Sequence, residues 1–280
     1  MIYKIEYTQN AREGFRRLFK SEPKAYNALV WCVTACSDDD PAEREDERWY
    51  EDEAALRADY MHALADAQWP DASKVSTSLM PISEANKELE WKTIDGKRMV
   101  LVCTMLNQSS LRFWQATDTF RLSKQTGIWV SIPAEWKHRA AQYAAYDSIA
   151  SRYRMIQMLG LWPGCDYDTM VEFYVDASTL FRPAHDPSIH TTTCGTAFPS
   201  WADESYTVGE TKFREWFAYQ SSTAYEGDYA CPWTQLGYTY DWHHGASREG
   251  LSEYIATYNS LALIKRRTGS WTFVREMVNK

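Results

Sequence analysis

Apolar residues recur along the chain in two periods, one typical of helices and one typical of strands. The clearest helical period lies in 51–68, where apolar residues recur every three or four positions. The acidic first turn of that segment favours the positive end of a helix dipole. Further helices are expected over 10–20, from Pro23 onward, from Pro133 to about Gly160, and over 211–220.

Runs rich in β-branched and aromatic residues predict strands, most of them in the second half of the chain. They cover 2–7, 98–106, 112–120, 127–133, 168–176, 234–242, 251–257, 260–266 and 270–276. Together the elements predict an α+β fold with a mainly antiparallel sheet. We expect a smaller, mostly helical N-terminal part, 1–88, and an α+β domain, 89–280, with the polar stretch 70–90 as the best linker candidate.

The composition narrows the class of protein. Of the 280 residues, 45% are hydrophobic, which is enough for a sizeable core and argues against a disordered chain. The sequence contains no apolar run of the roughly 18 residues that a membrane span needs. The first residues do not resemble a signal peptide, so a cytoplasmic protein that does not associate with a membrane is expected.

Charge is distributed unevenly around a net value of −8. Residues 38–59 contain eleven acids and three arginines, whereas 97–154 contains nine basic residues and three acids. The basic stretch would suit a phosphate-bearing ligand or a polyanion. The alternative is that these charges form ordinary solvated faces, or, for the acidic run, a helix start.

The cysteines and histidines do not form a recognisable metal motif, and no metal site is expected. The even number of cysteines, six, would suit disulfides in a small secreted domain, but reduced thiols fit this longer chain better. Two catalytic alternatives stay open. One is a nucleophile pair of His190 and Cys194, and the other is a carboxylate pair of Glu172 and Asp176.

The segment 232–253, PWTQLGYTYDWHHGASREGLSE, is the strongest candidate for a site. Alternation along a strand places Tyr238 and Tyr240 on one face, and Trp242 follows them. After a loop bounded by glycines, Glu253 enters a strand that otherwise consists of core residues. A carboxylate beside aromatic rings suggests a ligand site, and an edge-strand residue facing water is the alternative.

The chain resembles two groups of proteins in these sequence segments. PWTxLGYTYDW followed by GxSE, with LFRPxxDP and GIWVSIPAEW, resembles an uncharacterised bacterial family over roughly 125–256. The order of flexible loop, strand with glutamate and further strands is similar to that of the ADP-ribosyltransferases. That resemblance implies NAD as substrate, Glu253 as the catalytic residue, and Tyr238, Tyr240, Trp242 and Arg182 as residues that hold NAD, with Arg182 at the pyrophosphate.

The resemblance implies a transferase that moves ADP-ribose to a nucleic acid or protein, as a bacterial toxin or effector with an inhibitory partner would. A carboxylate at position 253 would stabilise the ribose cation that forms when nicotinamide leaves. Residue 251 is Leu and Glu249 lies four positions before Glu253, so the Glu-x-Glu pair that favours arginine acceptors is absent. The alternative is a non-catalytic protein-binding or immunity-type module with an aromatic-rich partner surface.

Overall fold

The computed structural model describes residues 48–115, 119–227 and 230–279. The chain divides into two compact units, Met1–Trp49 and Tyr50–Lys280, and all that follows concerns the second unit. The strand expected at 2–7 and the helices expected at 10–20 and from Pro23 lie outside the described residues. The division does not coincide with the predicted boundary between 88 and 89.

The described part is an α+β fold with mainly antiparallel sheets, as predicted. A five-stranded sheet has the order β1-β2-β5-β12-β3, a three-stranded sheet the order β4-β11-β6, and β9 pairs with β10 and β7 with β8. The strands are β1 (Trp91–Ile94), β2 (Lys97–Asn107), β3 (Thr119–Arg121), β4 (Ile128–Val130), β5 (Tyr167–Asp176), β6 (Leu180–Phe181), β7 (Thr207–Val208), β8 (Thr211–Lys212), β9 (Tyr238–Tyr240), β10 (Glu249–Ser252), β11 (Tyr254–Ala256) and β12 (Leu261–Gly269). The helices are α3 (Glu53–Ala67), α4 (Gln108–Gln115), α5 (Pro133–His138), α6 (Ser148–Met158), α7 (Phe213–Thr223) and α8 (Ser270–Val278).

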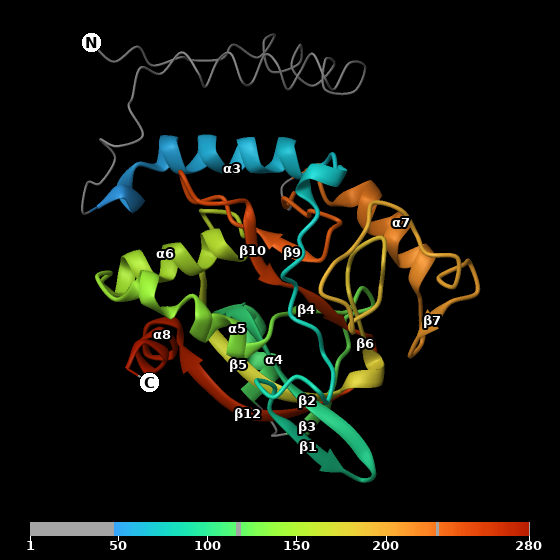
Figure 1. Ribbon diagram of the computed structural model, residues 1–280. Coiled ribbons are helices and arrows are strands. Elements are labelled where there is room, and N and C mark those ends of the chain that lie inside the picture. The colour runs from blue at the N-terminus through green and yellow to red at the C-terminus, as the bar shows by residue number, and fades with distance from the viewer. Residues whose placement is uncertain (1–47, 116–118, 228–229, 280) are drawn as a thin grey trace. The chain divides into compact units, whose positions relative to one another are not determined.

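The central strands β2 and β5 are long and apolar because both faces of their sheet are covered. Val100, Val102 and Phe173 belong to one cluster of buried residues, whereas Met105 and Met170 belong to another that includes side chains of α5, α6 and α8. Figure 1 shows these three helices gathered on one side of the sheet, near the C-terminus. The sheet therefore forms a rigid base, and the smaller sheets are built beside it.

Two predicted strands contain helices instead. The first, 112–120, is divided between α4 and β3, and Asn107 Oδ1 accepts a hydrogen bond of 2.8 Å from Ser110 N in the first turn of α4. The second, 270–276, is the helix α8. Phe273, Val274 and Met277 are buried there with helical spacing, so the apolar residues follow the longer period after all.

Helix α3 belongs to the same unit as the sheets. It begins at the N-cap Asp52, whose carboxylate accepts a 2.9 Å hydrogen bond from Ala55 N, which is the helix-start role considered for part of the acidic run. Tyr60 on α3 donates a hydrogen bond to Ala230 O, and Asp66 accepts one from Tyr240 on β9. Figure 1 shows α3 lying across the hairpin of β9 and β10. These contacts explain why the unit already begins at Tyr50.

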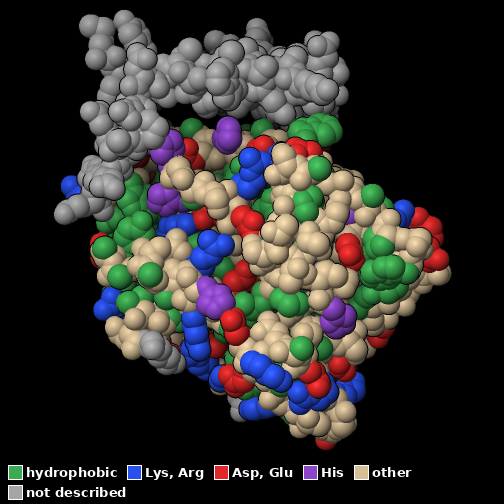
Figure 2. Space-filling model, viewed as in Figure 1, with side chains coloured by type: hydrophobic (Ala, Val, Ile, Leu, Met, Phe, Trp, Pro, Cys, Tyr) green, Lys and Arg blue, Asp and Glu red, His purple; other side chains and the backbone are tan. Residues whose placement is uncertain are grey.

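The described surface contains charges of both signs. Figure 2 shows acidic and basic side chains interspersed around the hairpin of β1 and β2 on the face in view. Within the described ranges, no helix combines the length and the apolar character that crossing a bilayer requires.

Candidate functional site

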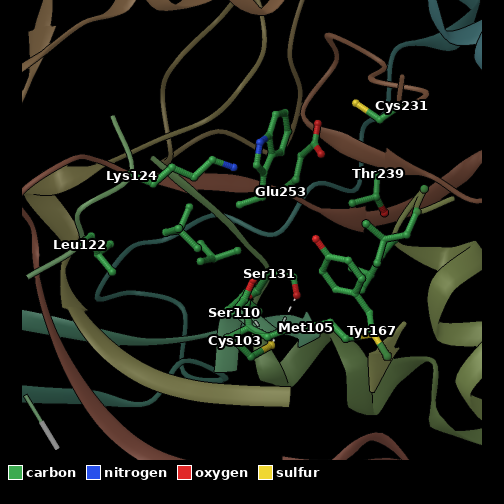
Figure 3. Close-up of a pocket in the computed structure, with 18 of the residues that line it drawn as sticks. Cys103, Met105, Ser110, Leu122, Lys124, Ser131, Tyr167, Cys231, Thr239 and Glu253 are labelled. Carbon is green, nitrogen blue, oxygen red and sulfur yellow. Dashed lines mark hydrogen bonds between the residues drawn. The ribbon is translucent and has the colours of Figure 1, made fainter. Parts of the chain in front are cut away.

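A cavity of about 570 Å³ is lined by residues of the large sheet, of the three-stranded sheet and of the β9–β10 pair (Figure 3). Its walls come from seven stretches of chain: the end of β2, α4, the segment from β3 to β4, the turn after α6, the start of β5, the region around β9, and Glu253. The volume is in the range of pockets that enclose small organic molecules. Apolar side chains predominate in its lining, and few charged groups reach it.

Glu253 lies at the junction where the chain passes from β10 to β11. Its backbone N–H donates a 3.1 Å hydrogen bond to Gly237 O, which fixes the direction of the side chain. The side chain lines the cavity and the residue is only 5% exposed. Carboxylate oxygen Oε1 is buried and has no hydrogen-bond partner among the described residues. Burial raises the pKa of Glu253 well above its usual range, and Arg182 offsets this only in part, so the environment favours the protonated carboxyl group.

Three tryptophans line the cavity together with this acid: Trp114, Trp129 and Trp233. Trp129 on β4 and Trp233 before β9 stand edge to face, with ring centroids 6.5 Å apart and planes at 79°. The indole N–H of Trp233 donates a 2.8 Å hydrogen bond to Pro183 O, which fixes its ring. Fixed aromatic rings of this kind hold planar ligands at a low entropic cost.

Lys124 and Cys231 are two further ionisable groups of the cavity lining. In Figure 3 the Lys124 side chain extends toward the part of the cavity where Glu253 lies, and Cys231 lies on the other side of Glu253. Lys124 comes from a solvent-accessible loop, and partial desolvation lowers the pKa of its amino group. Burial, together with the nearby Glu253, raises the pKa of the Cys231 thiol to about 12, so this thiol is not a nucleophile near neutral pH.

The predicted aromatic residues are divided between the cavity and the packing beneath α3. Tyr240 lines the cavity, and its hydroxyl group hydrogen-bonds to Asp66 at 3.0 Å. Tyr238 shares that face of β9, as predicted, and donates to Lys74 O at 2.8 Å. Trp242 donates to Leu161 O at 3.0 Å and packs edge-on against Tyr60. Neither Tyr238 nor Trp242 is among the residues that line the cavity.

Arg182 lies near Glu253 but does not reach the cavity. It is fully buried, and its guanidinium group donates to Ser188 O at 3.0 Å and Thr191 O at 2.8 Å. The sequence suggested Arg182 as the pyrophosphate ligand. Its position instead makes it an internal cation that affects the acid through its charge, because its Nε and Nη2 donate to backbone carbonyls.

The two catalytic alternatives are not supported by the geometry. Nδ1 of His190 bonds to Ile82 O at 2.7 Å, the Cys194 thiol faces Asp186 O, and burial raises the pKa of that thiol to about 12. Glu172 is paired with Arg266, and Asp176 accepts hydrogen bonds from Ser178.

The cysteines and the acidic and histidine side chains form neither bridges nor a ligand cluster where the structure is described. Cys103, Cys165, Cys194 and Cys231 are free thiols there. The same described ranges contain no group of three His, Cys, Asp or Glu side chains arranged to hold a metal ion. Cys32 and Cys36 lie outside these ranges.

The basic stretch 97–154 is largely occupied by internal contacts. Arg98 pairs with Glu84 at 2.7 Å, and Lys97 with Asp176 at 3.4 Å. Others hydrogen-bond to backbone carbonyls or to a buried acid: Arg121 to Asn259 O, Arg139 to Gly250 O, Arg152 to Tyr167 O and Arg154 to Asp241. The interpretation as a surface for a polyanion therefore loses much of its support, while Lys124 stays available at the cavity.

Sequence reasoning identified the acid but not the walls of its cavity. Trp129, Trp233 and Lys124 were not singled out as site residues, although the words GIWVSIP and PWTQLGYTYDW contain both tryptophans. Both segments contain a tryptophan, and this was the feature of the sequence that could have indicated the two cavity residues. Comparison of the chain with family models, curated proteins and solved structures gave no match.

Proposed function

We propose that this chain is an enzyme of the ADP-ribosyltransferase type, which transfers ADP-ribose from NAD to a nucleic acid or protein, with Glu253 as the catalytic residue. The observation that supports it is the buried Glu253 carboxyl group, whose Oε1 has no partner and which faces a cavity walled by tryptophans. Such an acid costs stability in the empty protein and is stabilised when a cationic group approaches it. The nicotinamide ring of NAD is planar and cationic, so it suits both the acid and the rings.

In this reaction the bond between ribose C1′ and the nicotinamide nitrogen breaks, and its electron pair stays with the nitrogen. Positive charge then develops on the ribose, where the Glu253 carboxylate stabilises it in a site shielded from water. The acceptor nucleophile forms the new bond to C1′ and gives up a proton, which the carboxylate can take. The cation of Lys124, at the same cavity, suits the phosphate groups of the substrate.

Release of nicotinamide from labelled NAD tests the proposal directly. We expect turnover by the wild type and a loss of about 100-fold or more in Glu253→Gln, which keeps the shape and removes the ionisable group. Glu249→Gln is the matched control. It is the same kind of substitution on β10, but the Glu249 carboxylate accepts hydrogen bonds from Ser76 and Ser78 and does not line the cavity. Equal turnover in all three proteins would rule out this role for Glu253.

The raised pKa of Glu253 gives a second test that needs no turnover, because a carboxyl group in this environment favours its protonated form. If a cationic ring binds beside it, the carboxyl group must lose its proton on binding. Calorimetry of NAD binding in buffers of different ionisation enthalpy should show this release in the wild type and its loss in Glu253→Gln. Binding without proton release would place the cationic ring elsewhere.

The described residues do not form one continuous aromatic surface that would support the alternative of a protein-binding module. The large exposed hydrophobic side chains of the described part lie on different elements: Met61, Trp69, Phe113, Ile149, Trp162, Trp201 and Tyr219. Most of the aromatic contacts instead lie inside the fold, around Phe213, Trp216 and Trp233. The excess of aromatic residues is thus largely explained by packing.

A further inference from the structure

A second buried acid binds the residue that precedes the cavity acid in the chain. Glu135 on α5 is 8% exposed, and its two carboxylate oxygens accept hydrogen bonds of 3.0 Å from the backbone N–H of Ser252. The Ser252 hydroxyl group donates a third bond, of 3.1 Å. Because neighbouring residues of a strand face opposite sides, Ser252 turns toward Glu135 while Glu253 turns toward the cavity.

A buried cation lies near both acids without pairing closely with either. Among the described residues, Arg182 has no carboxylate within ion-pair distance, and its Nη1 has no hydrogen-bond partner. Its guanidinium lies 5.2 Å from the Tyr254 ring centroid, and its Nη2 shares Met80 O with the Tyr254 hydroxyl group. Met80 N in turn donates to Ser252 Oγ at 2.7 Å. Arg182, Tyr254, Met80 and Ser252 therefore form one packed cluster. It connects the arginine with the segment that binds Glu135 through Ser252 and contains Glu253.

We propose that Glu135 is a positioning residue for Glu253: it fixes the strand at Ser252, and its negative charge offsets the positive potential of Arg182, so that it opposes a second negative charge on the cavity acid until a cationic ligand enters. The inference uses the proposed function only in taking Glu253 as the reactive group. The charge relation itself can be measured without any substrate.

The surroundings of the two acids decide which ionises first. Glu135 receives hydrogen bonds from Ser252 and faces two cations, Arg139 and Arg182, so although burial raises its pKa, the value is about 7. Glu253 has burial against it and only Arg182 in its favour. Hydrogen bonds from Ser252 favour the charged form of Glu135, whereas Glu253 Oε1 has no donor, so we expect Glu135 to ionise first and its charge to oppose a second one.

The other ionisable groups around the two acids are neutral at the relevant pH. Cys103 and Tyr254 face Glu135, and burial raises the pKa of both. The groups near Glu253 are thiols and phenols whose pKa burial also raises: Cys194, Cys231, Tyr225 and Tyr238. The cations that line the cavity are Lys124 and Arg121, and Arg121 donates to Asn259 O. Arg182 and Glu135 thus supply the main fixed charges behind Glu253.

The test is a titration of the carboxyl groups by infrared spectroscopy of the full chain labelled with ¹³C-glutamate. The protonated band that Glu253→Gln lacks identifies Glu253, and the band that Glu135→Gln lacks identifies Glu135. In the wild type the Glu135 band should disappear first as the pH rises. In Glu135→Gln the midpoint of Glu253 should fall by about one pH unit or more, because the opposing charge is gone.

Two controls separate charge from structure. Ser252→Ala removes the two hydrogen bonds of the hydroxyl group, to Glu135 and from Met80 N, and keeps both acids, whereas Glu249→Gln changes a neighbouring glutamate outside the cluster. Neither should lower the midpoint of Glu253. An unchanged midpoint in Glu135→Gln would overturn the proposal. So would ionisation of Glu253 before Glu135 in the wild type, which can be observed even if Glu135→Gln does not fold.

The titration and the enzymatic assay can fail independently. Absence of nicotinamide release would count against the proposed function and leave the order of ionisation intact. If turnover is present, the acidic limb of its pH profile should move to lower pH in Glu135→Gln by the same amount as the Glu253 band. A change in activity without that displacement would indicate a purely structural role for Glu135.

Discussion

The hairpin of β9 and β10 has a buried acid near each of its faces, and the two are treated in opposite ways. Asp241, after β9, receives two hydrogen bonds from Arg154 on α6, at 2.9 and 2.5 Å, and a third from His243 N at 3.1 Å. Glu253, after β10, has an oxygen with no partner and an arginine that bonds elsewhere. The first arrangement stabilises the fold, whereas the second leaves a cost that a ligand can remove. Comparing them separates a structural acid from a candidate functional one.

The largest effect is expected where the structural pair is broken. Arg154→Met leaves Asp241 buried without its cation, which should lower the free energy of unfolding by about 3–5 kcal/mol. Urea denaturation measures it. Lys212→Met is the control, because its pair with Glu215 is exposed and should be worth about 0–1 kcal/mol. Equal effects of the two substitutions would remove the distinction between buried and exposed pairs.

A methyl group at Gly237 should destabilise the region around Glu253 and Arg182. A Cβ there would lie 2.5 Å from Arg182 Cδ, and the backbone φ of +85° disfavours any side chain. Gly237→Ala should therefore destabilise the protein by roughly 2–4 kcal/mol and displace the arginine from behind Glu253. Gly227→Ala has a similar φ, of +81°, and open space around it, so it isolates the backbone contribution. Thermal unfolding that shows no difference between the two would contradict the close approach.

Replacing the cavity acid should raise the free energy of unfolding, whereas the two previous substitutions lower it. Glu253→Met removes an unpartnered buried polar group at similar volume, so the free energy of unfolding should rise by about 1–3 kcal/mol near pH 8 while nicotinamide release is lost. Asp241→Met, at the paired acid, should destabilise the fold. A loss of stability in Glu253→Met would mean that the carboxyl group has partners in solution.

The pH dependence sharpens the same comparison. Because the pKa of folded Glu253 is raised above its ordinary 4.5, the folded state keeps a proton that the unfolded chain releases, and stability falls as the pH rises through this range. Glu135, with its pKa raised to about 7, contributes in the same direction between these values. The difference between wild type and Glu253→Met should therefore grow with pH, by at most about 1.4 kcal/mol per pH unit. Urea midpoints from pH 5 to 8 measure it, and a constant difference would show that Glu253 titrates normally.

The smallest effect on stability is expected at the cavity's cation. Lys124→Met should change the free energy of unfolding by less than about 0.5 kcal/mol, since Lys124 lies on a solvent-accessible loop. Affinity for NAD should nevertheless fall by about tenfold, because the phosphate groups lose a cation. Fluorescence titration against Lys137→Met, a lysine that does not line this cavity, measures the difference. Equal affinities in the two variants would place the phosphates away from Lys124.

The sequence predicted the fold class and the central strands because their apolar runs are long. β2 and β5 extend over nearly the residues expected, whereas α4 and α8 were taken for strands. Those helices are short and contain aromatic residues, which favour both structures, so only burial against the sheet decides between them.

For the site, the sequence could indicate a glutamate that does not belong in a core strand, but not its surroundings. Glu253 stands out locally, whereas Trp129 and Lys124 are more than 120 positions away in the chain. Arg182 was found near the acid by position, yet its direction depends on the carbonyls of Ser188 and Thr191, which no local pattern reveals. Long-range contacts thus decide which polar residues serve the cavity and which serve the core.

The passage from β10 to β11 makes the chain intolerant of changes in length at this place. Its first half pairs with β9 and its second half with β4 and β6, and these pairings leave Glu253 between two anchored ends. A single inserted or deleted residue would exchange the faces, turning a serine into the cavity and a glutamate against Glu135. Natural variation in loop length should therefore accumulate between His243 and Ser247. A design that transfers this cavity to another protein must keep residues 249–256 together without insertion or deletion.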